Sequence, residues 1–381
     1  MRVDRVGVVG LGTMGAGIVE VFARAGLPVV GVEATPEFLE RGRGILEAST
    51  GRALARGRLS EEDRAALLAR VTWSSDVGDL ASVDLAVEAV PEVLDLKREV
   101  LAALDRVLAP GAVIATNTSS LPVTDLAEST GRPDRVVGMH FFNPAPVLRL
   151  VEVVTTVHSD PEAVACVRDL AVAVGKSPIV VGDRPGFVAN ALLLGYLGDA
   201  VALLDAGQVA RDELDASLVA AGMPMGPLAL LDLIGLDVAL AIFGVLAAAS
   251  PRYVVPPGLA ALVAEGRLGR KSGRGYWTYE RPGSGTVVDS GGEAAPVPGV
   301  ADALVLPYLN EALRMVQDGY ASADDVDTAM REGCGFPRGP VEEADDRGLP
   351  AVVAGLRQLG VEPVTMLADY VAAGRRTVRP A

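Results

Sequence analysis

Cysteine is scarce in this chain of 381 residues, which contains only Cys166 and Cys334. Two cysteines cannot form a disulfide framework, so we expect a reducing compartment and a cytoplasmic location. Aromatic residues make up 4% and charged residues 22% of the chain, while half of it is hydrophobic. This composition is typical of a globular α/β protein and excludes a disordered or fibrous chain. At roughly 150 residues per domain, the length predicts two or three domains.

Positive charge is also in deficit, since 34 lysine and arginine residues face 49 acidic residues and leave a net charge of −15. The resulting field repels phosphate, so we expect neither nucleic acid nor an anionic membrane as a partner, although a small anion fits a local basic site. The N-terminal residues enter a strand-like run directly, which predicts no signal peptide. The most apolar segment, Leu228 to Ala249, is interrupted by two aspartates, and its uninterrupted part of about 12 residues is shorter than a membrane span of ~20.

Strand-like and helical segments alternate over the first 180 residues, which predicts βαβ units and a largely parallel sheet. The predicted strands are Arg5–Val9, Leu27–Glu33, Asp84–Ala89, Ala112–Thr116, Val136–His140, Leu150–Val154 and Ile179–Val181. Helices are expected over Ala16–Ala25 and Pro36–Leu68, and the chain after residue 187 is mostly helical, with one helix over Pro227–Ala249. We therefore predict an α/β Rossmann-like N-terminal domain at 1–183, followed by an all-α C-terminal part.

The helical part contains an internal repeat. The aligned positions are Gly198–Gly207 with Asn310–Gly319, Asp215 with Asp327, Gly226-Pro227 with Gly339-Pro340, and Gly235 with Gly348. Such registered positions favour a duplication over chance similarity between helices rich in alanine and leucine. We predict two helical copies, at 184–280 and 300–381, joined by a linker rich in glycine, proline and serine at 281–299.

A glycine-rich sequence, Gly10-Leu11-Gly12-Thr13-Met14-Gly15, follows the first predicted strand and opens the first predicted helix. The first glycine permits a tight turn, the second lets the backbone approach a pyrophosphate, and the third lets helix and strand pack closely. Glu33 ends the second strand, where a carboxylate accepts hydrogen bonds from ribose hydroxyls. This context favours a dinucleotide site over a plain strand-to-helix turn. Because Glu33 repels a 2′-phosphate, NAD is preferred to NADP, although Arg41 and Arg43 are near in sequence.

Histidine occurs only twice, and His140 ends a predicted strand, where a Rossmann-like sheet binds its ligands. Oxidation of an alcohol needs a base beside the hydroxyl and a hydride acceptor at the carbon. Glu152 is a lone carboxylate in an apolar run, and a buried carboxylate needs a partner. We predict that Glu152 fixes the tautomer of His140 and favours its protonated form. His158 lies in a predicted turn and is interpreted as structural; no metal site is predicted.

Several motifs together resemble the L-3-hydroxyacyl-CoA dehydrogenase family, most closely the branch that includes 3-hydroxybutyryl-CoA dehydrogenases. The motifs are Gly10–Gly15, Asn117–Ser120, His140–Pro144, Glu152, Pro185–Asn190, Gly222–Pro227 and Gly269–Tyr276. The repeat extends this resemblance to family members with a duplicated helical domain. The resemblance implies NAD-dependent, reversible oxidation of a (3S)-3-hydroxyacyl-CoA to a 3-ketoacyl-CoA in fatty-acid metabolism, with a short-chain substrate such as 3-hydroxybutyryl-CoA.

The same resemblance assigns roles to residues. It implies that His140 is the base and Glu152 its orienting partner. It places Ser119 and Asn190 within hydrogen-bonding reach of the substrate oxygen or the catalytic histidine. The positions that match cofactor contacts are Glu92, Lys97, Asn143 and Lys271, and for the two lysines the alternative is ordinary solvent exposure. One departure is Ala191, where the family usually carries arginine.

Coenzyme A is polyanionic, so an acidic protein needs a local basic surface to bind it. The stretch from Arg41 to Arg58 carries five arginines and one acidic residue, Glu47. Within it, Arg52 and Arg56 are the candidates for binding the substrate's phosphates, because paired contacts between arginine and phosphate are strong and geometric. A plain solvated helix face is the alternative.

Three other interpretations fit parts of the pattern. A β-hydroxyacid dehydrogenase shares the glycine-rich start but uses a helical lysine as its catalytic group, whereas Lys176 lies at a strand entry before a proline. A hydroxyacyl group tethered to a carrier protein is a further substrate class. A non-catalytic protein that binds NAD or acyl-CoA is disfavoured by the intact catalytic set. Single-copy members of the family pair helical domains across a dimer, so this chain is either a homodimer or a monomer whose second copy replaces that contact.

Overall fold

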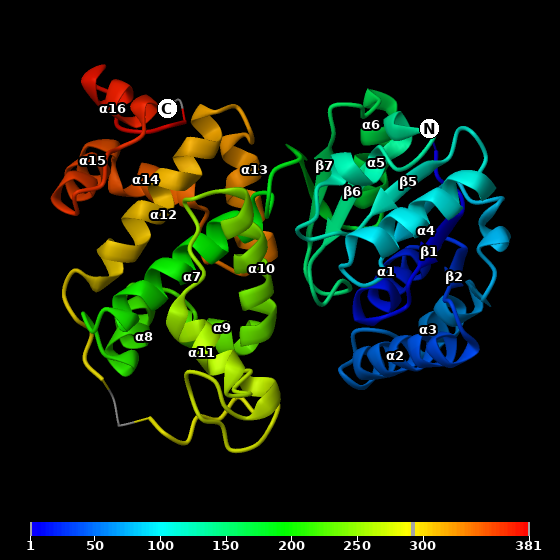
Figure 1. The fold of residues 1–381 in the computed structure, drawn as a ribbon, viewed down its shortest axis with the longest axis horizontal. Coiled ribbons are helices and arrows are strands. Elements are labelled where there is room, and N and C mark those ends of the chain that lie inside the picture. The colour runs from blue at the N-terminus through cyan, green and yellow to red at the C-terminus, as the bar shows by residue number, and fades with distance from the viewer. Residues whose placement is uncertain (1, 291–293, 380–381) are drawn as a thin grey trace. The chain divides into compact units, whose positions relative to one another are not determined.

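Residues 2–290 and 294–379 are described by the computed structural model in Figure 1. They divide into two compact units, Met1–Phe187 and Val188–Ala381. The first unit is a sheet covered by helices, and the second is built mainly from helices.

The first unit contains an eight-stranded sheet in the order β3-β2-β1-β4-β5-β6-β7-β8. The strands are β1 (Val6–Val9), β2 (Val29–Val32), β3 (Val71–Ser74), β4 (Leu85–Glu88), β5 (Val113–Thr116), β6 (Val136–Phe141), β7 (Leu150–Thr155) and β8 (Ser177–Gly182). Neighbours pair in parallel except β6 and β7, which are antiparallel. The first six strands have the order of a doubly wound nucleotide-binding sheet, which confirms the predicted α/β Rossmann-like class.

Helices cover both faces of this sheet, as strands of valine, leucine and alanine buried on both sides require. One hydrophobic core lies under α1 (Thr13–Arg24), α2 (Pro36–Ala55), α3 (Glu61–Ala69) and α6 (Pro161–Ala173). The other lies under α4 (Leu94–Val107), α5 (Val123–Ala127) and the 3-10 turn Val77–Leu80. Because each crossover returns the chain to the same edge, the carboxyl ends of β1, β2, β4, β5 and β6 meet at one edge of the sheet.

The structure corrects three local expectations. The stretch 36–68 is not one helix, because it breaks after Ala55, where Gly57 has a φ of 66°. Residues 227–249 form two helices bent by 97°, because Gly235 has a φ of 101°, which disfavours any residue with a side chain. Strand β3 is absent from the sequence prediction, because its sequence Val-Thr-Trp-Ser is not the apolar run that marks the other four-residue strands, and only its two end residues are buried.

The second unit holds ten α-helices among its described residues. They are α7 (Ala189–Asp205), α8 (Arg211–Ala220), α9 (Pro227–Ile234), α10 (Leu236–Ala249), α11 (Pro257–Ala264), α12 (Val300–Gln317), α13 (Ala323–Thr328), α14 (Pro340–Arg347), α15 (Leu349–Gln358) and α16 (Thr365–Ala372). No single helix in the described part of the chain is long and apolar enough to cross a bilayer. The one pair that passes such a test on length and composition, α9 with α10, is the bent pair.

The repeat in the sequence corresponds to a repeated local structure. Asp215 accepts a hydrogen bond from the backbone N–H of Leu228 at 2.9 Å, at the start of α9, and Asp327 accepts one from Val341 at 2.7 Å, at the start of α14. The glycine before each helix leaves room for the aspartate, since an added Cβ would lie 2.2 Å from Cγ of Asp215 or 2.1 Å from that of Asp327. The domain boundaries at 183, 280 and 299 stay predictions.

Candidate active site

The glycine-rich turn between β1 and α1 has the geometry that its sequence predicts. Gly10 has a φ of 88°, and a Cβ on it would lie 2.7 Å from the backbone of Ala89. A Cβ on Gly15 would lie 1.7 Å from the carbonyl oxygen of Gly10, so only glycine lets α1 start this close to β1. Gly12 caps α1 without a side-chain hydrogen bond, and a Cβ on it would meet nothing within 4 Å. The open start of α1 therefore offers N–H groups to an anion.

Glu33 is held over this turn by backbone hydrogen bonds. Its Oε1 accepts from Leu11 N–H at 2.6 Å, and its Oε2 accepts from Ala34 N–H at 3.1 Å. The Leu11 side chain is 1% exposed and its N–H already donates to Glu33, whereas Thr13 is exposed and Met14 half-buried. An uncapped helix start beside a fixed carboxylate fits the pyrophosphate and ribose of NAD and repels a 2′-phosphate.

His140 and Glu152 face each other across β6 and β7. The antiparallel register pairs the two residues directly, and His140 Nδ1 lies 2.8 Å from Glu152 Oε2. Both are buried, with 5% and 0% of their surfaces exposed. The rings of Phe142 and Phe187 flank the imidazole, with centroids 4.5 and 5.7 Å from its own. The carboxylate assigns the proton to Nδ1, so Nε2 is the nitrogen that can accept another.

Glu92 organises the turn that follows β5. Its Oε1 accepts hydrogen bonds from the hydroxyls of Thr118, Ser119 and Ser120 at 2.7, 3.2 and 3.0 Å, and from the N–H of Ser119 at 2.9 Å. Burial alone would raise the pKa of Glu92, but Lys97 at 3.3 Å and these donors outweigh burial and lower the pKa. Glu92 is therefore ionised and orients Ser119, the residue predicted to reach the substrate oxygen.

Lys97 is buried, with 1% of its surface exposed. Its ammonium donates to Glu88 Oε1 at 2.7 Å and to the carbonyl of Val90 at 3.2 Å. Glu88 also accepts from the Thr116 hydroxyl at 2.7 Å, so the cluster ties α4 to the ends of β4 and β5. The alternative of an ordinary solvated lysine is wrong for Lys97. Sequence reasoning missed Glu88, although a lone carboxylate in an apolar strand is the same signal that indicates Glu152.

Two asparagines complete this edge of the sheet. Asn117 Oδ1 accepts from the N–H of Phe141 at 2.8 Å and so joins the ends of β5 and β6. Asn143 is exposed in the segment of residues 142–149, which joins β6 to β7. The structure thus brings to one edge of the sheet most of the predicted site residues, namely Gly10–Gly15, Glu33, Glu92, Lys97, Ser119, His140, Asn143 and Glu152.

Comparison with known proteins agrees with this geometry. The family model described as 3-hydroxyacyl-CoA dehydrogenase, NAD binding domain, matches residues 5–184, and the model of that family's C-terminal domain matches residues 186–279 and 300–376. The chain belongs to the 3-hydroxyacyl-CoA dehydrogenase family. It is therefore an oxidoreductase that uses NAD, which supplies the hydride acceptor.

Relatives of this family differ in how much of the chain they match. A 3-hydroxybutyryl-CoA dehydrogenase of Mycobacterium tuberculosis is 44% identical over 73% of this chain and 99% of its own length. A peroxisomal bifunctional enzyme of Cavia porcellus is 36% identical over 93% of this chain and 53% of its own length. The crystal structure of a 3-hydroxybutyryl-CoA dehydrogenase from Escherichia coli has 29% identity and a TM-score of 0.88, over 98% of this chain and 99% of that one. The family therefore includes relatives that match both helical halves of this chain.

Asn190 and Lys271 belong to the second unit, and their roles in the family's reaction stay predictions. Asn190 lies half-buried in the first turn of α7. The side chain of Lys271 is 47% exposed and pairs with Asp237 at 2.5 Å. The motif around Lys271 is fixed by Asp232, which is buried and accepts from Tyr276 N–H at 2.9 Å. The position of Ala191, where the family usually carries arginine, is buried.

Arg52 and Arg56 lie at the end of α2. Arg52 is in its last turn and Arg56 is its C-cap, and both are exposed. Their spacing of four residues places them on one side of the chain at this point. The structure therefore agrees with a basic surface here, and its contact with coenzyme A stays a prediction.

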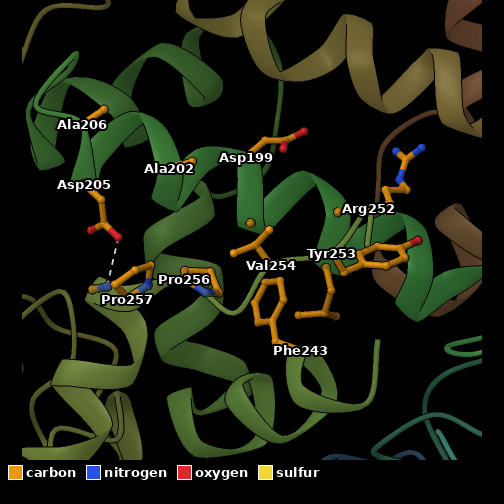
Figure 2. A pocket seen from close by; sticks show the side chains of 14 residues that line it. Asp199, Ala202, Asp205, Ala206, Phe243, Arg252, Tyr253, Val254, Pro256 and Pro257 are labelled. Carbon is orange, nitrogen blue, oxygen red and sulfur yellow. Dashed lines mark hydrogen bonds between the residues drawn. The ribbon is translucent and has the colours of Figure 1, made fainter. Parts of the chain in front are cut away.

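The second unit also contains a cavity of about 780 Å³, shown in Figure 2. It lies between α7, α10 and residues 252–258, and its wall includes Gly198, Phe243 and Val254. At one end Asp205 accepts a hydrogen bond from Gly258 N–H at 2.9 Å. None of the residues that the sequence predicts for the site lines this cavity, so it is not assigned to the reaction.

Proposed function

We propose that this enzyme oxidises short-chain (3S)-3-hydroxyacyl-CoA thioesters reversibly, with 3-hydroxybutyryl-CoA as its substrate. The observation that carries the proposal is the buried pair of His140 and Glu152, 2.8 Å apart at the edge of the sheet that also holds the glycine-rich turn. The short acyl chain is supported by relatives that are named 3-hydroxybutyryl-CoA dehydrogenases.

In the oxidation, Nε2 of His140 takes the proton of the 3-hydroxyl, while the hydride on carbon 3 would pass to the acceptor that NAD supplies when bound. The Ser119 hydroxyl has one proton to donate, and with substrate bound it turns from Glu92 to the oxygen that becomes the ketone, while the Ser119 N–H keeps its bond to Glu92. Asn190 is its predicted companion. Glu152 compensates the positive charge that develops on the imidazole and keeps the ring oriented. In the reduction His140 returns the proton.

The decisive test is an NADH absorbance assay on acyl-CoA substrates with chains of four to sixteen carbons. We expect the highest kcat/KM for acetoacetyl-CoA. A preference for long acyl chains would overturn the proposed acyl chain length. Turnover of carrier-tethered substrates alone would show that the acyl group is carried by a protein and not by coenzyme A. NADH binding without turnover of any acyl thioester would favour a binding protein.

We also propose that Arg52 and Arg56 bind the phosphates of coenzyme A. The double variant Arg52→Glu/Arg56→Glu should raise KM for acetoacetyl-CoA about tenfold or more, because charge-assisted contacts become repulsive, and should leave NADH affinity unchanged. Arg168→Glu, an exposed site on α6, is the matched control. Wild-type KM in the double variant would remove both residues from the substrate site.

We further propose that the enzyme is a monomer in a reducing compartment such as the cytoplasm. The packing of α7 against α12, with Tyr196 and Tyr308 at 6.0 Å between ring centroids, supports a second helical copy that replaces a dimer contact. The reducing compartment is supported by the cysteine count, because two cysteines, Cys166 and Cys334, are too few for a disulfide framework. Light scattering would reveal a dimer if the assembly proposal is wrong.

A further inference from the structure

Lys176 is the one of the three lysines that has no predicted role in the proposed reaction. It follows the C-terminal turn of α6, where Gly175 has a φ of 79° and the Lys176 N–H donates to the carbonyl of Ala171 at 2.9 Å. The residue is 8% exposed, and its side chain reaches the segment of residues 142–149. A buried lysine is costly, so its contacts need an explanation.

The Lys176 ammonium binds the backbone of that segment. Nζ donates to the carbonyl of Ala145 at 2.5 Å and to the carbonyl of Leu148 at 2.7 Å. The segment has no regular helix or strand, and two of its own N–H groups, those of Val147 and Leu148, both donate to Pro144 at 2.9 and 3.0 Å. The ammonium therefore satisfies two carbonyl groups that lie outside any ladder or helix.

The segment also packs against α1. Ala145 is 2% exposed, and a Cβ on Gly17 would lie 3.2 Å from Ala145 Cβ and 3.3 Å from Pro146 Cδ. The segment is thus packed against the helix that begins at the nucleotide turn. It also carries Asn143 and connects the two strands that hold His140 and Glu152.

Among the residues that the structure describes, none forms an ion pair with Lys176. Burial, together with the nearby Arg149 and Arg24, lowers the pKa of Lys176 to about 8, while Glu20 opposes this shift. The hydrogen-bond acceptors are backbone carbonyl groups rather than carboxylates. The chain uses arginine far more often than lysine. Here a compact ammonium with rotatable N–H donors can bond to two carbonyl groups, for which the fixed planar donors of a guanidinium are less well placed.

We infer that Lys176 is a positioning residue of the enzyme, which fixes residues 142–149 through the carbonyl groups of Ala145 and Leu148 and so places Asn143 for contact with the cofactor. It acts through the segment and touches neither substrate nor cofactor. The inference rests on the use of NAD and on the predicted cofactor contact of Asn143, and it is independent of which acyl-CoA is the substrate.

The first test is the dissociation constant of NADH, measured by its fluorescence with the Lys176→Met variant of the full chain. Loss of both hydrogen bonds should raise this dissociation constant about tenfold, because the net free energy of each bond corresponds to roughly a threefold or larger change in an equilibrium constant. At saturating cofactor kcat should fall by roughly threefold or less, because the His140–Glu152 register is kept by the paired strands. Arg168→Met removes a cation of α6 whose partner is the exposed Asp169, and it should bind NADH like the wild type.

A double-mutant cycle separates positioning from a general effect on stability. In an Asn143→Ala background, Lys176→Met should add little to the loss of NADH affinity, because the contact that it positions is already absent. Wild-type affinity in Lys176→Met with only a lower Tm would overturn the inference, as would full additivity with Asn143→Ala. If Lys176→Met does not fold, Lys176→Arg decides: a raised dissociation constant supports positioning and an unchanged one overturns it.

Discussion

In the first unit the carboxylate of Glu152 is buried against a base that can take up a proton, the imidazole of His140 at 2.8 Å. In the second unit the carboxylate of Asp215 is buried against groups that cannot, since it accepts from Leu228 N–H at 2.9 Å and from the Trp277 indole at 2.9 Å. Both carboxylates have lost most of their contact with water. What differs is whether the partner can exchange a proton with a substrate.

Because the partners differ, removal of a buried carboxylate should have different consequences in the two units. A carboxylate beside imidazole stabilises the charge that appears during a proton transfer, so its loss affects the rate. A carboxylate that caps a helix start satisfies backbone N–H groups, so its loss affects the free energy of unfolding. Substitutions in the two units should therefore separate activity from stability.

The largest effect is expected for His140→Gln, which keeps a polar side chain beside Glu152 but cannot act as a base. Loss of general base catalysis should lower kcat/KM about 10²- to 10⁴-fold while Tm changes little. His158→Gln is the matched control, because that histidine is exposed and its hydrogen-bond partner, Glu128 at 2.9 Å, is not one of the site residues. Initial rates of NADH formation and thermal melts of both variants provide the measurement, and a His140→Gln enzyme with most of its activity would refute the assignment.

The next effect concerns pH and the second unit. Burial raises the pKa of Asp215 from 3.8 to about 6, although hydrogen bonds from Leu228 N–H and the Trp277 indole oppose it. The folded state therefore holds this proton more tightly than the unfolded state. Its contribution to stability is complete below about pH 4 and is lost as the pH rises through 6, up to roughly 3 kcal/mol.

Urea unfolding at several pH values checks this linkage. The free energy of unfolding of the wild type should fall between pH 4 and 7, and this part of the slope should be missing in Asp215→Asn. Asp346→Asn, an exposed carboxylate on α14, should keep the wild-type slope. Equal slopes in all three proteins would contradict the assignment of the titration to Asp215.

Pairs of residues on neighbouring strands are the part of the site that the sequence predicts well. His140 and Glu152 each stand alone in an apolar run, and the short connection of residues 142–149 between their strands allows the direct antiparallel pairing that the structure shows. The glycine-rich turn and Glu33 are likewise predicted from spacing, because strand, turn and helix fix their distances within one βαβ unit.

Contacts that depend on which of several partners a side chain meets are not predictable in this way. Glu88 and Lys97 are nine positions apart on different elements, and no periodicity says that they pair. The break at Gly235 is hidden because the apolar pattern continues across it, and a single glycine is tolerated in many helices. The hydrogen bond from the Lys176 ammonium to the carbonyl of Ala145 depends on tertiary packing alone.

Glu33 tests the comparison of the two units most directly. Its carboxylate accepts from backbone N–H groups, as that of Asp215 does, but it lies in the first unit at the nucleotide turn. If its position decides its role, Glu33→Ala should raise KM for NAD about tenfold, as loss of one or two hydrogen bonds to ribose would, and should narrow the preference over NADP by removing a repulsive charge. Glu37→Ala, an exposed acid in the first turn of α2, is the control and should change neither constant. Steady-state kinetics with both cofactors and a thermal melt separate the outcomes: a lower Tm with an unchanged KM for NAD would place Glu33 with the structural carboxylates of the second unit.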